Sequence, residues 1–327
     1  MAILVFTGGK QKKNATTVEE WSRYDGGVII TFDLEKRKVL DTISYYSPSE
    51  FIPNKEPSVL LKSSSIEQNT LLTCTQTEVL KYDLNNLKLI KRISNPVFND
   101  VHHVIKHGDN YLVVSTGLDA LFEVNEEGDV INEWSTIDKG IWERFDKNVD
   151  YRKVLSTKPH SSHPNFIAKV GDELWITRFE QRDAKCLTDS SRPVIPIGIQ
   201  KPHDGLLYNG KLHYTTVNSH IVIADPKTSK ILEVINLNEI DNTLLSLGWC
   251  RGLYIDGDVA IVGFTRIRPT KFLSNIDWLK NPKRNLRNMK SKPTRIAAYN
   301  IKSKTKLWEF SLENNDMNAI FSILHWK

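Results

Sequence analysis

The segment PHDGLLYNGKLHYTTVNSHIVIADPKTSKILEVINL, residues 202–237, alternates short apolar runs with turns. A polar cluster opens the segment, an apolar run follows, and a turn carrying Gly210 precedes a second apolar run. Two further runs follow, joined by the turn DPKTSK. Short runs rich in β-branched and aromatic residues, separated by turn residues, are typical of strands. The segment therefore predicts a four-stranded antiparallel sheet.

The same pattern recurs in three other segments, residues 101–134, 163–187 and 250–269. Each has a polar cluster, an apolar run, a turn with Gly-Asp or Gly-Lys, and a second apolar run. The turn glycines of the four segments are 63, 39 and 47 residues apart: Gly108, Gly171, Gly210 and Gly257. A repeat of roughly 40 to 50 residues with four strands is the period of a β-propeller blade.

The rest of the chain supplies two more blades. Residues 58–96 contain four apolar runs, the N-terminus contains three, and the C-terminal NAIFSILHW contains one. We therefore predict an all-β fold, a single six-bladed β-propeller domain spanning residues 1–327 and closed by a blade combining N- and C-terminal strands. Such closure leaves no free sheet edge. Insertions are expected at about 137–159, which is partly helical in pattern, and at 270–293.

Charge, the length of apolar runs and cysteine content indicate the kind of environment in which the protein is found. Among 327 residues there are 44 Lys and Arg and 39 Asp and Glu, a net charge of +5. No apolar run approaches the roughly 18 residues of a membrane span. Three cysteines form an odd, widely spaced set without a CxxC motif, which is typical of a reducing compartment and predicts a cytoplasmic protein.

The basic residues gather in the segment from Thr265 to Ile296, which has ten Lys and Arg and one acid. One interpretation is a solvated loop. The other is a surface facing an anion such as phosphate, sulfate, a glycan or an acidic partner. No nucleic-acid-binding signature is present, so nucleic acid is an unlikely partner.

Polar residues occupy equivalent positions at one mouth of the predicted channel. The residues just before the innermost strand of each blade face this mouth, as do those where the second strand ends. The strand starts are His102–His103, His163–Asn165, His203–Asp204 and Arg251, and the second-strand ends are Arg178 and Arg266. The sequence therefore predicts a polar His/Arg pocket at this mouth.

Histidines from separate strands can bind a divalent metal ion with one position open. The predicted metal ligands are His102, His103, His163 and His203, with the metal unidentified. Alternatively a histidine serves as a general base, because its pKa lies near working pH. His163 and His203 are then the catalytic candidates, and Asp204 is a base, a metal ligand or an acceptor that orients a histidine. A third interpretation is that each histidine only hydrogen-bonds neighbouring blades.

Arginine guanidinium groups bind carboxylate, sulfate or phosphate through two parallel hydrogen bonds. The alternative is that each arginine pairs with a nearby acid such as Asp183. The predicted ligand contacts are Arg178, Arg251, Arg266 and Asn165.

The motifs HPNF, KPHDG, GWCRGL, FTRIRPTKF, PTRIAAYN and MNAIFSIL, within residues 100–327, together resemble an uncharacterised family of bacterial six-bladed β-propellers. The unit from Asp100 to Trp134 is more distantly similar to repeats of arylsulfotransferase-like and streptogramin-lyase-like propellers. The resemblance implies the propeller fold. Gluconolactonase-type propellers share the blade number, but their calcium site needs inward carboxylates that this chain does not supply.

Two functions from different classes remain open. The first is a pocket that binds a small anionic ligand and acts as a metal-dependent lyase or hydrolase. The second is a non-catalytic propeller that binds a ligand or a protein, with structural histidines. The basic insertion at 270–293 is expected to form part of the pocket rim and attract anions, or else to form a contact between copies in a homo-oligomer.

Overall fold

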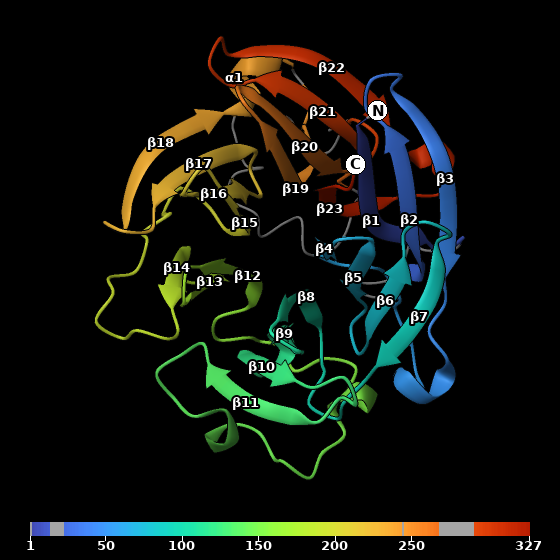
Figure 1. Cartoon of the computed structure of the whole chain (residues 1–327), viewed down its shortest axis with the longest axis vertical. Coiled ribbons are helices and arrows are strands. Elements are labelled where there is room, and N and C mark those ends of the chain that lie inside the picture. Colours follow the sequence, from blue (N-terminus) through green and yellow to red (C-terminus); the bar gives the residue numbers. More distant parts are fainter. Residues whose placement is uncertain (1, 14–22, 244, 268–290) are drawn as a thin grey trace.

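Six antiparallel sheets are arranged in a ring (Figure 1). The computed structural model describes residues 2–13, 23–243, 245–267 and 291–327. We number the sheets as blades 1 to 6 along the chain, starting with the blade that contains both termini. The predicted six-bladed propeller is thus confirmed.

In blades 2 to 5 the strands follow one another from the centre of the ring outward, joined by short turns, whereas blade 1 takes its innermost strand from the C-terminal end and blade 6 has a long connection between its second and third strands. Blade 1 contains β23 (Ala319–His325), β1 (Ile3–Gln11), β2 (Tyr24–Asp33) and β3 (Lys38–Tyr45); blade 2 contains β4 (Ser65–Glu67), β5 (Thr70–Cys74), β6 (Val79–Asp83) and β7 (Lys88–Ile93); blade 3 contains β8 (Val101–His107), β9 (Asn110–Ser115), β10 (Ala120–Val124) and β11 (Val130–Ser135). Blade 4 contains β12 (Pro164–Val170), β13 (Glu173–Arg178) and β14 (Asp183–Cys186); blade 5 contains β15 (Pro202–Tyr208), β16 (Lys211–Thr216), β17 (His220–Asp225) and β18 (Lys230–Asn236); blade 6 contains β19 (Trp249–Asp256), β20 (Val259–Thr265), β21 (Arg295–Asn300) and β22 (Thr305–Ser311).

The ring closes in blade 1, as predicted. The innermost strand β23 comes from the C-terminus and pairs antiparallel with β1, which pairs in turn with β2. Beyond the strands, the amide of Trp326 donates to the carbonyl of Ile3 over 2.9 Å. The two ends of the chain are therefore held by one continuous ladder.

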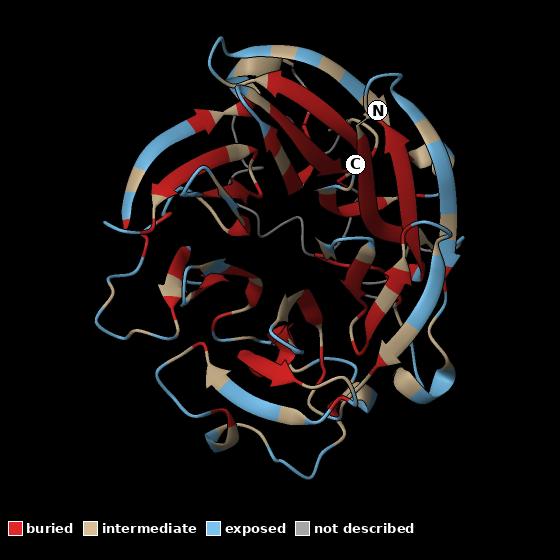
Figure 2. Cartoon of the chain, viewed as in Figure 1, coloured by how far each residue is buried: buried red, intermediate tan, exposed pale blue. Residues whose placement is uncertain are grey.

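Apolar side chains fill the spaces between neighbouring blades. The middle strands are buried along most of their length, because a blade covers each of their faces, whereas the outer strands β3, β7, β11 and β18 are largely exposed (Figure 2). One cluster, for example, joins Leu72 and Val79 of blade 2 to Val113 and Phe122 of blade 3. Burial of such surface stabilises the fold by about 25 cal/mol per Å², so blade-to-blade contact supplies the core.

Blade 4 differs from the others in the described part of the chain, because its sheet has three strands. The segment after β14 takes the place of a fourth strand at one point only, where Ile195 and Ala184 exchange backbone hydrogen bonds of 2.8 and 3.1 Å.

Helical structure is sparse, as expected. The described ranges contain one α-helix, α1 (Leu237–Asp241), and short 3-10 turns: η2 (Ser49–Phe51), η3 (Thr116–Leu118), η4 (Ile141–Glu143), η5 (Tyr151–Lys153) and η9 (Glu313–Asn315). Two of these turns, η4 and η5, lie in the insertion predicted at 137–159. In the same ranges no helix has the length and apolar character needed to cross a membrane.

Candidate functional site

A β-bulge interrupts the start of the innermost strand in blades 3, 4, 5 and 6. The register shifts between Val101 and His103, Pro164 and Phe166, His203 and Leu206, and Cys250 and Leu253. A bulge takes a residue out of the ladder and re-aims side chains, and bulges are common beside functional sites. The bulges coincide with the polar clusters that the sequence places at the mouth. We call the inner ends of the blades that carry them the hub.

His103 is a contact between blades. Its Nδ1 accepts the backbone N–H of Ile167 over 3.1 Å, and its ring stacks on Phe166 with 3.8 Å between centroids. A further hydrogen bond joins the ring to the backbone of Ser64, and burial lowers the pKa of His103 to about 3. Because Nδ1 accepts, the proton lies on Nε2, so neither nitrogen has a lone pair left for a metal ion.

Asp204 is a second contact between blades. Its carboxylate accepts the N–H of Gly252 at 3.1 Å and the hydroxyl of Thr215, while its own carbonyl accepts the hydroxyl of Thr177 over 2.7 Å. These bonds join blades 4, 5 and 6. Burial raises the pKa of Asp204 to about 6. The carboxylate predicted to be catalytic thus forms its hydrogen bonds with residues of the fold, Thr215 and Gly252.

Asn165 also connects blades, since its Nδ2 donates to the carbonyl of Pro202 over 2.8 Å. Its Oδ1, by contrast, is buried and has no hydrogen-bond partner in the described part of the chain. Of the two polar side-chain atoms of Asn165, Nδ2 therefore holds neighbouring blades together, whereas Oδ1 has no hydrogen bond within the described residues.

Two of the three predicted arginines form ion pairs with two hydrogen bonds each. Arg178 donates to both carboxylate oxygens of Asp183 over 2.7 and 2.6 Å. Arg266 does the same to Glu313, again over 2.7 and 2.6 Å. A guanidinium edge paired in this way is not presented to a ligand, so the alternative interpretation fits these two positions better.

The other predicted residues come together at the hub. The ring of His163 lies 5.0 Å from that of His102 and 4.8 Å from that of Phe179, which lies 5.3 Å from His203, all measured between centroids. His160 joins them, with its Nδ1 3.0 Å from the Nδ1 of His163. Three of the four predicted histidines therefore belong to one row.

Lys62 and Asp100 complete this group and were missed by sequence reasoning. The Lys62 ammonium, 3% exposed, forms an ion pair with Asp100 and lies 3.3 Å from Nδ1 of His102. Lys62 precedes β4, at the position in blade 2 that corresponds to the polar clusters of blades 3 to 6. This equivalent position in the repeat could have identified Lys62 from the sequence. We call Lys62, His102, His163, His203 and Arg251 the hub cluster.

The hub cluster combines cations with neutral imidazoles. Burial, and after it the charge of Lys62, lower the pKa of His102 to about 3. The pKa values of His163 and His203 also lie well below the usual range, mainly through burial, and Arg251 contributes at His203. Arg251 itself lies over the ring of Phe321, 4.7 Å from its centroid. At neutral pH the cluster therefore holds the charge of Arg251 and the Lys62–Asp100 ion pair beside uncharged imidazoles.

His203 stands out within the cluster. Its side chain is 4% exposed, and its Nε2 has no hydrogen-bond partner among the residues that the structure describes. A buried polar atom without a hydrogen bond lowers the stability of the fold by about 1–3 kcal/mol. Such an atom is expected where a bound group or a water supplies the missing bond.

The four predicted metal ligands do not form one donor set. Both nitrogens of His103 are used, and Nδ1 of His102 contacts the carbonyl of Asp100 over 2.7 Å, which leaves only Nε2 with a lone pair. Within the described ranges, no three His, Cys, Asp or Glu side chains are grouped as a metal ion requires. A divalent metal stays a prediction from the sequence, and nothing below depends on one.

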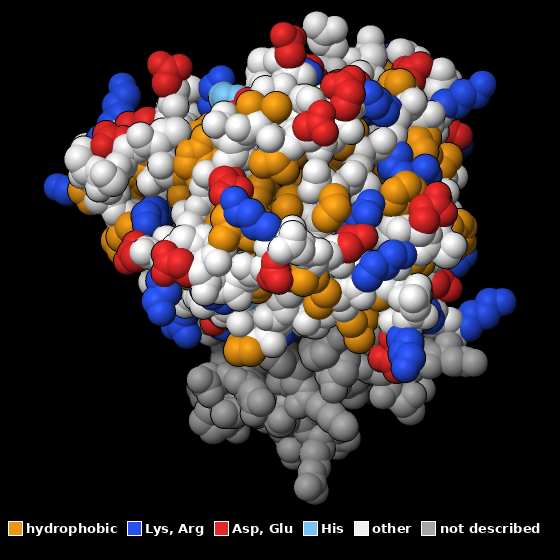
Figure 3. All heavy atoms as spheres, turned by 90° about the horizontal axis from the view of Figure 1, so that it is seen from below, with side chains coloured by type: hydrophobic (Ala, Val, Ile, Leu, Met, Phe, Trp, Pro, Cys, Tyr) orange, Lys and Arg blue, Asp and Glu red, His pale blue; other side chains and the backbone are white. Residues whose placement is uncertain are grey.

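Local charge distinguishes the hub from the outer surface. On the face that Figure 3 shows, Lys and Arg alternate with Asp and Glu, without a large area of one sign. The basic insertion leaves blade 6 between β20 and β21, as predicted, but most of it, including Lys280, Lys283, Arg284 and Arg287, lies outside the described residues. Among the described residues, Lys62 and Arg251 are the cations of the hub cluster, and Lys62 is paired with Asp100.

The cysteines are packing residues. Cys74, Cys186 and Cys250 are all buried free thiols. Burial raises the pKa of Cys74 to about 12 and that of Cys250 well above its ordinary value. Neither of these two thiols is a thiolate at neutral pH, so Cys250 is not a nucleophile despite lying next to Arg251.

Comparison with known proteins gives the fold and no family. No family model matches the sequence, and no curated protein matches it. The structure is similar to a protein of unknown function from Bacteroides caccae, with a TM-score of 0.61, 10% identity and all of both chains covered. It is also similar to a chain in the structure of a nidogen/laminin complex, with a TM-score of 0.59, 10% identity, and 100% of this chain and 99% of that chain covered. Identities this low show the propeller architecture alone, and the predicted likeness to arylsulfotransferase-like and streptogramin-lyase-like proteins is not shown.

Proposed function

We propose that this propeller binds a small anionic ligand at the hub cluster. The observation that carries the proposal is His203, a buried imidazole whose Nε2 lacks a hydrogen-bond partner in the described part of the chain, beside the charges of Lys62 and Arg251. A neutral imidazole presents an N–H donor, and the nearby guanidinium of Arg251 attracts negative charge, whereas the charge of Lys62 is offset by its ion pair with Asp100. A carboxylate, phosphate or sulfate group has the matching acceptors.

Binding is favoured over acid–base catalysis at this cluster. A general base works best when its pKa lies near the operating pH. The pKa values of His102, His163 and His203 lie well below neutrality because these rings are buried next to positive charge. Each imidazole is therefore a weak base. The lyase or hydrolase reaction predicted from the sequence gains no support from this environment.

The contribution of Arg251 gives a direct test. In isothermal titration calorimetry with inorganic phosphate, sulfate and small carboxylates, the intact protein should bind at least one of these anions saturably. Arg251→Gln should weaken that binding about tenfold or more, because a hydrogen bond to a charged group contributes about 1.5–3 kcal/mol.

Arg266→Gln is the matched control, because Arg266 is paired with Glu313 at the edge of the hub. This variant should keep the affinity of the unaltered protein within about twofold. An equal loss of affinity in both variants, with thermal denaturation showing both to be folded, would contradict the proposal. So would the absence of saturable binding by every anion tested.

A further inference from the structure

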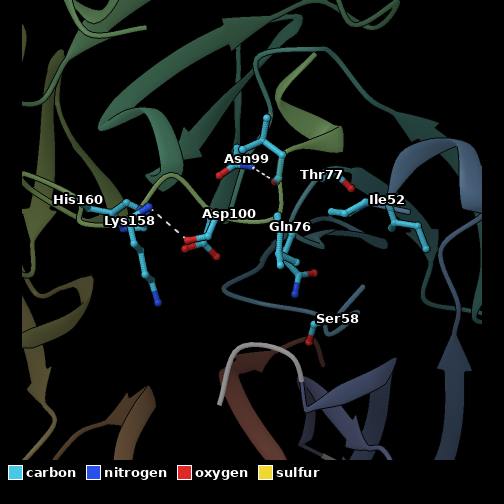
Figure 4. A pocket seen from close by; sticks show the side chains of 12 residues that line it. Ile52, Ser58, Gln76, Thr77, Asn99, Asp100, Lys158 and His160 are labelled. Atoms are coloured by element: carbon cyan, nitrogen blue, oxygen red, sulfur yellow. Dashed lines mark hydrogen bonds between the residues drawn. The ribbon is translucent and has the colours of Figure 1, made fainter. Parts of the chain in front are cut away.

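A pocket lies at the edge of blades 2 and 3, walled by the end of the first predicted insertion (Figure 4). About 560 Å³ of space lies in and in front of the pocket, and this figure includes open solvent. Its polar wall comes from three separate segments: Gln76 and Thr77 in the turn between β5 and β6, Asn99 and Asp100 before β8, and Lys158 and His160 before β12. Ile52, Pro53 and Val154 add apolar surface.

The walls are held in place by hydrogen bonds. The Nδ2 of Asn99 donates to the carbonyls of Tyr151 and Val154, over 2.8 Å each. Across the pocket, the ammonium of Lys153 donates to the carbonyls of Ser49 and Ile52, over 3.0 Å each. The insertion at 137–159 is therefore tied to the hub side and to the connection between blades 1 and 2. Such anchoring preorganises a pocket for a ligand.

Three polar atoms of this wall have no hydrogen-bond partner in the described part of the chain. Oε1 of Gln76, Oγ1 of Thr77 and Nε2 of His160 are buried and make no hydrogen bond within the described residues. The Thr77 side chain is 2% exposed. Because buried polar atoms normally have a hydrogen-bond partner, three such atoms in one wall indicate that a bound ligand supplies the missing hydrogen bonds. Leu155, 45% exposed at the edge of the pocket, is a side chain that can move to admit one.

The kinds of polar atom in the wall define the ligand. An anion has only acceptors, which Oε1 of Gln76 and the carboxylate of Asp100 would repel. An ammonium group has only donors, and the carboxylate of Asp100 that would accept them is already paired with Lys62. A hydroxyl group donates and accepts, so it can bond to an amide oxygen, a threonine hydroxyl and either tautomer of His160.

We propose that this pocket binds a neutral polyhydroxylated ligand, such as a sugar or polyol unit, through Gln76, Thr77 and His160. The pocket adjoins the hub cluster, because Asp100 pairs with Lys62 and His160 contacts His163, but it takes a different class of ligand and does not require an anion at the hub. Asp100 is left unaltered in the test, because it also pairs with Lys62.

Thr77→Val separates a ligand contact from a structural residue. The substitution keeps the shape and removes an oxygen that the described fold does not use. We expect the thermal midpoint of the variant to stay equal or rise, whereas polyol binding falls about tenfold. Thr75→Val provides the contrast, because its hydroxyl donates to Glu78 over 3.0 Å and its loss should lower the midpoint.

Binding is measured by ligand-observed NMR on the full chain with glycerol, myo-inositol, D-glucose and D-ribose, and with ethanolamine and inorganic phosphate as competing chemistries. Thr228→Val, in the distant turn between β17 and β18, should bind as the unaltered protein does. Saturable polyol binding that is lost in Thr77→Val and kept in Thr228→Val supports the proposal. Failure of all four polyols to bind, or binding of ethanolamine or phosphate that requires Thr77, overturns it.

Discussion

Lowering the pH from 7 to about 5 is expected to destabilise this protein by several kcal/mol. His102, His103 and His203 are 7%, 1% and 4% exposed, and their pKa values are far below the usual 6.5 because of burial. In the unfolded chain each would take up a proton as the pH falls below 6.5, whereas in the folded chain each stays neutral. Their contribution to stability is therefore complete above pH 6.5 and is lost as the pH falls.

The loss is about 2 kcal/mol per histidine at pH 5, when proton uptake is integrated from the unfolded pKa. Asp204 acts in the opposite direction. Its pKa is about 6 in the fold, against an ordinary value of 3.8, so its protonation restores about 1 kcal/mol over the same interval. Since whole domains are stable by about 5–15 kcal/mol, the net loss is a large fraction of the total.

Urea denaturation at a series of pH values measures this effect through the free energy of unfolding. His203→Leu should make the dependence on pH shallower by one proton, because one buried imidazole is removed. His325→Asn should leave it unchanged, because His325 is exposed at the end of β23. A free energy of unfolding that does not change between pH 7 and 5 would show that the hub histidines are not buried as described.

Gly8→Ala is expected to destabilise the protein by about 3 kcal/mol or more. A Cβ at this position would lie 1.9 Å from the carbonyl oxygen of Ala319 and 3.1 Å from the side chain of Met317. Because Ala319 is backbone of β23, the clash cannot be relieved by a side-chain rotation. The methyl group must push β1 away from the strand that closes the ring.

Gly171→Ala is the control for this substitution. Gly171 has φ +61 in the turn before β13, and a Cβ there meets no atom within 4 Å. Its replacement should cost only the strain of a left-handed conformation, about 1–2 kcal/mol. Chemical denaturation of both variants gives the comparison. Equal losses would mean that β1 and β23 are not packed as tightly as the closed ring requires.

The architecture could be predicted from sequence because each blade repeats a local pattern. Turn glycines such as Gly108 and Gly210 mark a hairpin whatever surrounds them, and the apolar runs between them have the length of strands. The closing blade followed from counting runs at the two termini. The three-stranded sheet of blade 4 was not predicted, although the two further apolar runs that end 101–134 and 202–237 have no counterpart within 163–187.

The clustering of polar residues at the hub was predicted from their positions in the repeat, whereas the contacts that each one makes were not, for a physical reason. Adjacent residues on a strand face opposite ways, and a bulge changes which one does so. His102 and His103 are neighbours in sequence, yet one belongs to the hub cluster and the other stacks on Phe166. The ion pair between Arg266 and Glu313 could not be predicted from the sequence either, because the two residues are 47 positions apart. Register and tertiary pairing decide these roles.

The hub cluster is tested most directly by the imidazole nitrogen resonances of the histidines, recorded with and without the anion that binds in calorimetry. If the anion occupies the hub cluster, the resonances of His203 shift in proportion to occupancy, whereas those of His103, whose nitrogens bond to neighbouring blades, stay in place. Saturation of the protein with the anion while the resonances of His203 do not move would contradict the assignment of the hub cluster as the binding site.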